Sequence, residues 1–358
     1  MGQRLFNFSA GPGMLPLEVL EASARALVDY QGKGYGIAEI SHRSKDFDTV
    51  MDEVQRRARE LLSIPANYDV LFTQGGASQL FITIPMNFLL GAADFIVTGE
   101  WAKKAAEAAK PYGAVRVLAS SESTGFDRIP KDWKASADAS YLHICTNNTI
   151  YGTRWSILPE HACLFADMSS EYLARVVDVK KFALIYGGAQ KNLGPSGVCM
   201  TIVRQDLYAR IPQSVPKLFS FQALAENDSR INTPPTFGLY MLLEMFRWIE
   251  KQGGVAAIER RNEEKAQLIY DAIDRAPEFY QGTVTDLPNR SRMNITCRLP
   301  NEELTGTFLK QADLRGMIAL KGYRSVGGIR ASIYNAMPVE GCAALAQFMN
   351  EFREASRK

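Results

Sequence analysis

Short apolar runs alternate with longer segments of helical spacing through residues 68–204. The runs are rich in β-branched and aromatic residues and end at glycine or polar residues, which is typical of buried strands. They cover residues 69–73, 95–97, 114–118, 141–145, 162–166, 182–186 and 198–203. Strands that alternate with helices form a sheet covered by helices, so we expect an α/β fold with a mainly parallel seven-stranded sheet. The last strand follows a hairpin-like turn and is the candidate for an antiparallel strand.

Helical spacing dominates the segments on either side of this alternation. Residues 17–30 and 46–62 have charged outer faces, and residues 236–276 have one break, at Gly253-Gly254. These segments predict long amphipathic helices that cover the sheet.

The pattern shortens beyond residue 277, where it predicts strands at 293–297 and 329–333 and a helix at 339–354. A smaller α+β domain fits this mixture. Glycine and proline near the start of the chain argue against regular structure there. The expected parts are an N-terminal arm (residues 1–15), a large domain (16–258) and a smaller C-terminal domain (259–358).

Charge and hydrophobicity indicate which kinds of partner the chain is expected to bind. The 41 basic residues nearly balance the 39 acidic ones, so no electrostatic argument favours nucleic acid. The longest apolar stretch, residues 81–90, is too short to span a bilayer, and the start of the chain lacks the apolar region of a secretory signal. We therefore expect small-molecule partners, with neither nucleic acid nor membrane.

The cysteines and histidines argue against disulfides and metals. The chain has five cysteines, an odd number, and no Cys-x-x-Cys pair. Buried thiols in the reducing cytoplasm explain them best, so we expect a cytoplasmic location. The three histidines are scattered, and no metal site is expected.

Two charged residues stand at the ends of predicted strands. Asp167 follows the run 162–166, and Lys191 lies in a glycine-rich segment after the run 182–186. Open α/β sheets bind ligands at such ends, and a lysine and an aspartate there can hold opposite sides of pyridoxal phosphate. Taken alone, the lysine is more often a solvated loop residue and the aspartate a helix N-cap.

Three further strand ends carry chemistry that suits the same cofactor. Gly75-Gly76-Ala77-Ser78 opens a helix and can bind phosphate through backbone N–H groups. Trp101 can stack on a flat ring, and Thr149 can bond a ring hydroxyl. Each has an ordinary alternative: a plain loop, core packing, and an asparagine-rich turn.

The order of these features resembles the fold-type I family of pyridoxal phosphate enzymes. Longer motifs resemble the phosphoserine aminotransferases among the class V aminotransferases. These motifs are NFSAGPG at 7–13, ISHRS at 40–44, GAQKN at 188–192, NTPPTF at 232–237 and GGIRASIYN at 327–335. The resemblance runs from about residue 5 to 354.

The resemblance implies a role for each position in a homodimer with shared active sites. Lys191 would bind pyridoxal 5′-phosphate covalently, Asp167 would pair with the ring nitrogen, and Trp101 would stack on the ring. The remaining cofactor contacts would come from Ala77, Ser78, Gln190 and Thr149, with Asn232 and Thr233 from the other subunit.

The implied substrates carry carboxylates and a phosphate, which arginine binds in a bidentate way. Arg330 would bind the α-carboxylate, and His42, Arg43 and Arg324 the phosphate or the glutamate side chain, with Ser9 nearby. The implied reaction interconverts glutamate and 3-phosphohydroxypyruvate with 2-oxoglutarate and phosphoserine, in serine biosynthesis. A phosphorylated hydroxythreonine of vitamin B6 biosynthesis is a related substrate.

Two positions depart from some members of that family, which have arginine in place of Ser78 and histidine in place of Tyr323. This chain therefore offers fewer cationic groups to the substrate phosphate.

Three other functions remain open. A cysteine desulfurase-like lyase needs a cysteine on an exposed loop, and none of the five is so placed. A glyoxylate-linked transaminase would have less need of so many arginines. A dimeric binding protein with a glycine-rich ligand loop would not bind the cofactor at all.

Overall fold

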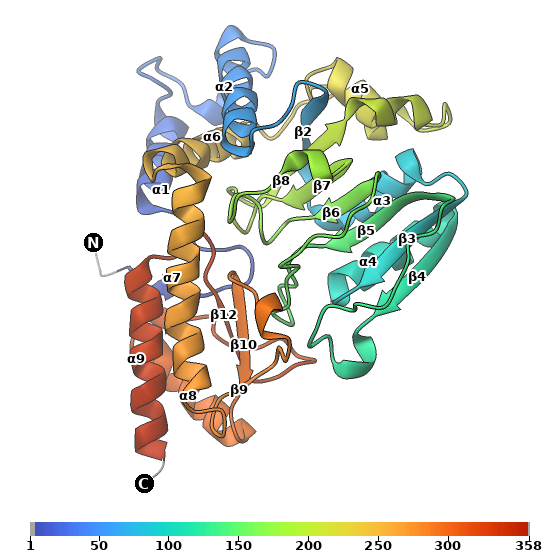
Figure 1. Ribbon diagram of the computed structural model, residues 1–358. Helices are drawn as coiled ribbons and strands as arrows, with labels where there is room; N and C mark the ends of the chain where they lie inside the picture. Colours follow the sequence, from blue (N-terminus) through green and yellow to red (C-terminus); the bar gives the residue numbers. More distant parts are fainter. Residues whose placement is uncertain (1–3, 357–358) are drawn as a thin grey trace.

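A single sheet of seven strands forms the centre of the computed structural model, which describes residues 4–356 (Figure 1). The strands are β2 (Tyr68–Gly75), β3 (Ala92–Val97), β4 (Ala114–Ser120), β5 (Ala139–Cys145), β6 (Leu164–Asp167), β7 (Leu184–Gly188) and β8 (Gly197–Arg204). They lie in the order β2-β8-β7-β6-β5-β3-β4. Only β8 runs antiparallel to its neighbours. The prediction of a mainly parallel seven-stranded sheet is confirmed, including the antiparallel last strand.

Helices cover both faces of this sheet. Along β2, Val70 and Phe72 belong to one hydrophobic core and Leu71, between them, belongs to another. Successive side chains of a strand point to opposite faces, so the two cores lie on opposite sides of the sheet. The first core includes α1 (Leu17–Val28), α2 (Lys45–Leu62), α6 (Thr236–Lys251) and the start of α7 (Gly254–Asp274). The second includes α3 (Ala77–Phe88), α4 (Glu100–Ala109) and α5 (Phe221–Glu226).

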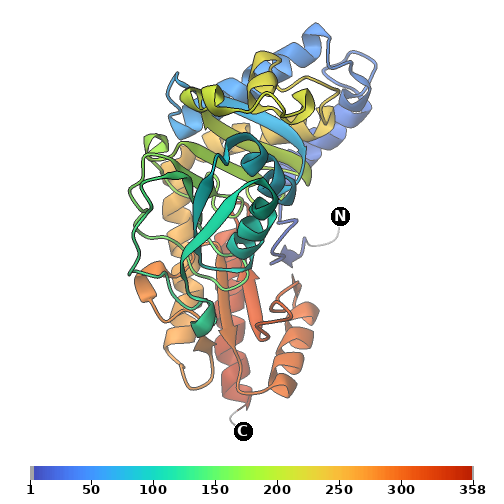
Figure 2. The same ribbon diagram turned by 90° about the vertical axis from the view of Figure 1, so that its right-hand side faces the viewer.

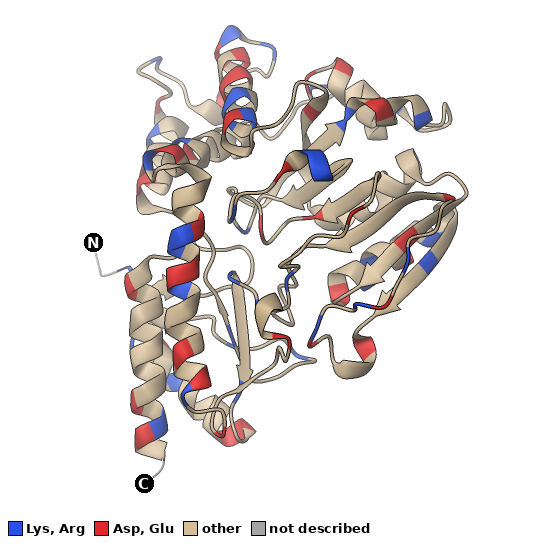
Figure 3. Cartoon of the chain, in the orientation of Figure 1, with Lys and Arg blue, Asp and Glu red and all other residues tan. Residues whose placement is uncertain are grey.

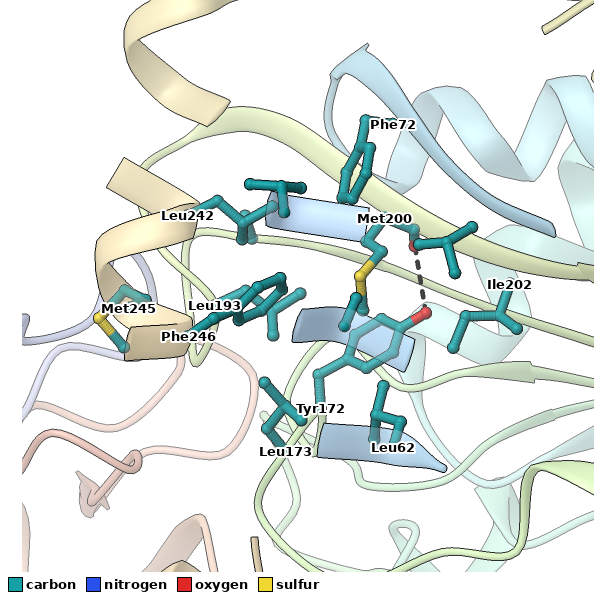
Figure 4. Packing of buried hydrophobic residues seen from close by; sticks show 14 of the residues in the cluster. Leu62, Phe72, Tyr172, Leu173, Leu193, Met200, Ile202, Leu242, Met245 and Phe246 are labelled. Carbon is teal, nitrogen blue, oxygen red and sulfur yellow. Dashed lines mark hydrogen bonds between the residues drawn. The ribbon is translucent and has the colours of Figure 1, made fainter. Parts of the chain in front are cut away.

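The first core is densely filled where α6 meets the sheet (Figure 4). Leu242 and Phe246 on α6 are fully buried and lie on the same side of the sheet as Met200 of β8. Tyr172 is buried in this core, and its hydroxyl donates a hydrogen bond of 3.1 Å to the Met200 carbonyl oxygen. Burial of this phenol is therefore compatible with an apolar core, because its polar atom has a partner.

A second, smaller domain lies at one end of the molecule, away from α2, in both views (Figures 1 and 2). Its antiparallel sheet has the order β12-β10-β9, and α7, α8 and α9 share its core. The elements are β9 (Gln281–Gly282), β10 (Asn294–Arg298), α8 (Glu302–Leu314), β12 (Ile329–Ser332) and α9 (Val339–Ser356). This arrangement is the expected α+β architecture.

Helix α8 was not predicted from the sequence. Thr305, Gly306 and Thr307 are weak helix formers that hide its helical spacing. The Asn301 side chain caps the helix by accepting a hydrogen bond of 2.8 Å from the Leu304 amide.

The N-terminal arm is less irregular than expected. Phe6–Asn7 form β1, which pairs in parallel with β11 (Met317–Ile318) of the small domain. Phe8 and Met14 are buried in the small-domain core. The arm is therefore held against the small domain, while the proposed domain limits stay a prediction.

Charges of both signs are interspersed over the helices (Figure 3). Lysine, arginine, aspartate and glutamate mix along α2 and α7. In residues 4–356, no helix has both the length and the apolar character needed to cross a bilayer.

The α6 core predicts a stability difference between two chemically identical substitutions. Leu242 has no exposed surface and Leu314 is 87% exposed. Leu242→Ala is expected to lower the free energy of unfolding by about 3 kcal/mol, since it leaves a cavity, and Leu314→Ala by less than about 0.5 kcal/mol. Urea denaturation measures the free energy of unfolding of both variants. Equal losses of this free energy would contradict the assigned packing.

Candidate active site

The carboxyl ends of β6 and β7 lie side by side and carry the acid and the amine that the sequence singled out. Asp167 ends β6 and is paired in register with Tyr186 of β7. Lys191 lies in the turn that follows β7. The two strands are parallel, so both side chains emerge at the same edge of the sheet, where α/β folds bind ligands.

Asp167 is held by the turn after β6. Its Oδ1 accepts hydrogen bonds from the Ser169 amide at 2.9 Å and the Ser169 hydroxyl at 2.6 Å. The same hydroxyl accepts a bond of 3.1 Å from the Gly188 amide, which ties the ends of the two strands together. Both of these bonds use Oδ1, so among the bonds of residues 4–356 Oδ2 stays available to accept one from a ligand.

Burial is the largest influence on the ionisation of both groups. It raises the pKa of Asp167, against the opposing effects of Lys191 and Ser169. It also lowers the pKa of Lys191, which Asp167 opposes. A lowered pKa favours the neutral amine, which is the nucleophilic form of lysine.

Thr149 and Trp101 lie beside this amine. Lys191 Nζ donates a hydrogen bond of 2.8 Å to Thr149 Oγ1 and lies 6.0 Å from the centre of the Trp101 ring. The indole Nε1 of Trp101 is buried without a partner in the described part of the chain. These residues, predicted from separate strand ends, are brought together.

Asn148 fixes the turn that carries Thr149 against Thr98, which lies just before α4, the helix that carries Trp101. The sequence did not reveal this role. Its buried amide nitrogen donates to Thr98 Oγ1 at 3.1 Å and to Thr153 Oγ1 at 2.8 Å. A side chain at Gly99 would come within 2.4 Å of its oxygen. The sequence indicated only an asparagine-rich turn, because the partners of Asn148 cannot be identified from local spacing.

The start of α3 is suited to an anion. Its N-cap is Gly76, so no side chain caps the first-turn N–H groups, and Gly75 has φ of 100°, which glycine adopts readily. Ala77 is partly buried and Ser78 is exposed. Together with the buried acid, the amine and the unpartnered indole, this helix end fits a cofactor with a ring nitrogen and a phosphate.

The N-terminal arm covers the lysine turn. The Gly13 amide donates a bond of 2.7 Å to the Gln190 carbonyl oxygen, and a side chain at Gly13 would come within 2.9 Å of the Lys191 carbonyl oxygen. The Ser9 hydroxyl accepts a bond of 3.3 Å from the Gly11 amide, which places Ser9 on the same part of the arm.

Arg330 approaches the site from the small domain. Its guanidinium donates a bond of 3.3 Å to the Thr149 carbonyl oxygen and lies 6.0 Å from the Tyr323 ring centre. Thr149 thus contacts both the amine of Lys191 and the guanidinium of Arg330.

The remaining predicted residues form no bond with this group within one chain. Across residues 4–356, no hydrogen bond or ion pair joins them to Lys191, Asp167 or Thr149. Thr233 lies next to the edge of the sheet, where its carbonyl oxygen accepts a hydrogen bond from the Gln74 side chain. The others are His42, in the loop before α2, and the exposed Arg43, Asn232 and Arg324. Their predicted roles stay predictions.

His143 on β5 is a buried histidine close to this edge of the sheet. Its Nε2 is 2.8 Å from the Tyr186 hydroxyl, and burial lowers its pKa to about 3 from 6.5. Between these values the unfolded chain binds a proton that the folded chain does not, so folding stability falls as the pH drops below about 6.5.

We expect His143→Phe to remove about 2 kcal/mol of the stability lost between pH 7 and pH 5. Urea denaturation at several pH values measures the change. Tyr186→Phe breaks the same hydrogen bond but keeps the imidazole, so it should retain the wild-type pH dependence. If the free energy of unfolding depends on pH equally in the wild type and in His143→Phe, this histidine does not cause the loss of stability at low pH.

Comparison with known proteins places the chain in a family. It matches the family Aminotransferase class-V over residues 5–345 and belongs to that family. It is therefore a pyridoxal phosphate-dependent aminotransferase, as the resemblance implied.

The relatives narrow the comparison. A phosphoserine aminotransferase of Geobacillus kaustophilus is 49% identical, over 98% of this chain and 99% of the relative. The solved phosphoserine aminotransferase of Bacillus circulans subsp. alkalophilus has a TM-score of 0.96 at 47% identity, covering 99% of this chain and 100% of the other. A pyridoxal phosphate-bound phosphoserine aminotransferase of Trichomonas vaginalis has a TM-score of 0.91 at 36% identity, covering 97% and 100%.

Proposed function

We propose that this aminotransferase transfers the amino group of glutamate to 3-phosphohydroxypyruvate, giving phosphoserine and 2-oxoglutarate. The observation that carries the proposal is the meeting of Lys191, Asp167 and Arg330 around one threonine turn. The full-length relatives named phosphoserine aminotransferase support the choice of substrate. The reaction belongs to serine biosynthesis, and a phosphorylated hydroxythreonine of vitamin B6 biosynthesis is a second candidate substrate.

The residues around Lys191 would hold the cofactor. Lys191 would bind it covalently, Asp167 would keep the ring nitrogen protonated, and Trp101 would cover the ring face. Pyridoxal phosphate supplies a ring that draws negative charge away from the substrate Cα. The phosphate would lie at the start of α3, with Ala77, Ser78 and Gln190, while Thr149 would face the ring oxygen.

Lys191 would also move the proton. Once displaced by the amino acid, its neutral amine can take the proton from the substrate Cα and return it to the neighbouring carbon. Burial favours this role, because it lowers the pKa of the amine. The carboxylate of Asp167 does not exchange a proton with the substrate but stabilises the positive charge at the ring nitrogen.

Arg330 would bind the α-carboxylate, since its guanidinium reaches the turn beside Lys191 from the small domain. The substrate phosphate would be bound by His42, Arg43 and Arg324, with Ser9 at the edge of the site. Ser78 and Tyr323 add no positive charge there. Binding of the phosphate therefore depends strongly on these few cationic groups.

We also propose a homodimer whose subunits complete one another's sites. Within residues 4–356 of one chain, Arg43, Asn232 and Thr233 are exposed and have no bond to Lys191, Asp167 or Thr149. Leu17, Leu27 and Val28 of the α1 segment are exposed as well, which suits a contact between subunits.

Lys191→Ala is expected to lower the turnover number by about 10³-fold or more and to abolish the visible absorbance that comes from the covalent link between the protein and the cofactor. Lys181→Ala, at an exposed lysine before β7, should leave both the turnover number and the absorbance unchanged. The assay compares phosphoserine with serine and alanine as donors, with 2-oxoglutarate as acceptor. An unchanged rate in Lys191→Ala, or a preference for unphosphorylated donors, would contradict the proposed function.

Shared sites predict complementation between two inactive variants. A dimer of one Lys191→Ala subunit and one Arg43→Ala subunit has one site with both native residues if Arg43 serves the neighbouring subunit. Coexpression at equal amounts should then restore about a quarter of wild-type activity, because half of the dimers are mixed and each has one intact site. No recovery, or a monomer in analytical ultracentrifugation, would contradict shared sites.

A further inference from the structure

Lys265 is a fully buried lysine outside the site described above. It lies on α7, has no exposed surface, and its Nζ donates hydrogen bonds of 2.9 Å to the Ile333 carbonyl oxygen and 2.8 Å to the Tyr334 carbonyl oxygen. In residues 4–356, no carboxylate forms an ion pair with it. Burying an ammonium group is unfavourable, so an apolar residue would fill this space at less cost. What an apolar residue would lose is the pair of bonds to the main chain.

The groups that face Lys265 do not neutralise it. They are Cys342 on α9 and Arg261 on α7. Burial raises the pKa of Cys342 to about 12, so its thiol stays neutral. Burial also lowers the pKa of Lys265 to about 7. The neutral amine retains two N–H bonds, enough for both carbonyl groups, so these contacts persist when the proton is lost.

The two carbonyl groups belong to residues 333–335, which we call the junction segment. It directly follows β12, the strand that carries Arg330. The Tyr334 hydroxyl donates a bond of 2.6 Å to the Ala10 carbonyl oxygen of the arm. The Asn335 amide donates a bond of 3.0 Å to Asn192 Oδ1, beside Lys191. The junction segment therefore connects the arginine strand, the arm and the lysine turn.

Helix α7 contacts the junction segment at a second point. Asn262, one turn before Lys265, donates a bond of 2.9 Å to Asn335 Oδ1. Val255 and Ile258, near the start of α7, pack in the large-domain core, and Ile269, further along, packs in the small-domain core. The contacts thus lie where α7 passes from one core to the other, as its course in Figure 1 shows.

We propose that Lys265 is a positioning residue, which holds the junction segment so that Arg330 and Lys191 face the same substrate. This inference rests on the proposed function, in which Arg330 binds the substrate carboxylate. Loss of the two bonds would let the end of β12 move relative to the lysine turn, and small misplacements of reacting groups are costly for catalysis.

The test compares Lys265→Met with Lys310→Met, a matched change at an exposed lysine of α8. With phosphoserine as donor, Lys265→Met is expected to lower kcat/KM by about 10- to 100-fold while the protein still binds the cofactor. Hydrogen exchange should become faster in residues 8–13 and 329–336. Lys310→Met should change neither kcat/KM nor the hydrogen exchange. A wild-type kcat/KM and wild-type hydrogen exchange in Lys265→Met would overturn the proposal.

A double-mutant cycle with Arg330→Met separates positioning from general destabilisation. If Lys265 acts through Arg330, adding Lys265→Met to Arg330→Met should lower kcat/KM by less than about threefold. If Lys265→Met lowers kcat/KM in the Arg330→Met variant as much as in the wild type, Lys265 acts independently of Arg330 and the proposal is overturned.

Lys265→Gln keeps N–H donors and should recover part of the activity and of the exchange protection. It replaces Lys265→Met in the cycle if the methionine variant does not fold, and failure of both variants to fold would assign Lys265 to stability alone. If the wild-type protein lacks activity toward phosphoserine, the proposed function fails, whereas the hydrogen exchange of the junction segment still tests the contacts of Lys265.

Discussion

The site depends on a buried acid and a buried amine at the ends of adjacent parallel strands. Burial shifts the pKa of each toward its neutral form, and each opposes the shift of the other. A pyridinium ring between them would change this balance, because it offers Asp167 a cationic partner and takes up the amine of Lys191. The Ser169 hydroxyl bonds both Asp167 at the end of β6 and Gly188 at the end of β7, and so holds the two strand ends at a fixed separation.

Residues at strand ends could be predicted from the sequence, because an apolar run followed by a polar residue locates the edge of a sheet. Lys191, Asp167, Thr149 and Trp101 were all found in this way, and the structure brings them together. Arg330 was different: its place beside Thr149 depends on a contact between positions 181 residues apart, and only the family resemblance pointed to it.

The residues that the sequence did not predict hold the residues of the site in place and are not themselves part of the site. Asn148, Ser169 and Tyr334 resemble ordinary turn or core residues, since each also bonds a residue far away in the sequence, which local spacing does not reveal. Helix α8 escaped for a local reason, because its threonines and glycine mask the helical pattern. The overall sheet was easier to predict, since seven apolar runs each carry the same signal.

The close approach of Gly13 to the lysine turn has a practical consequence for handling the protein. The arm is held at β1 and again at Tyr334, with little space between it and the main chain of Lys191. Fusion partners or affinity tags that pull on the arm would disturb the cover of the reactive amine, whereas α9 ends in the small domain without a role in that cover. Purification handles are therefore better attached beyond α9 than ahead of the arm.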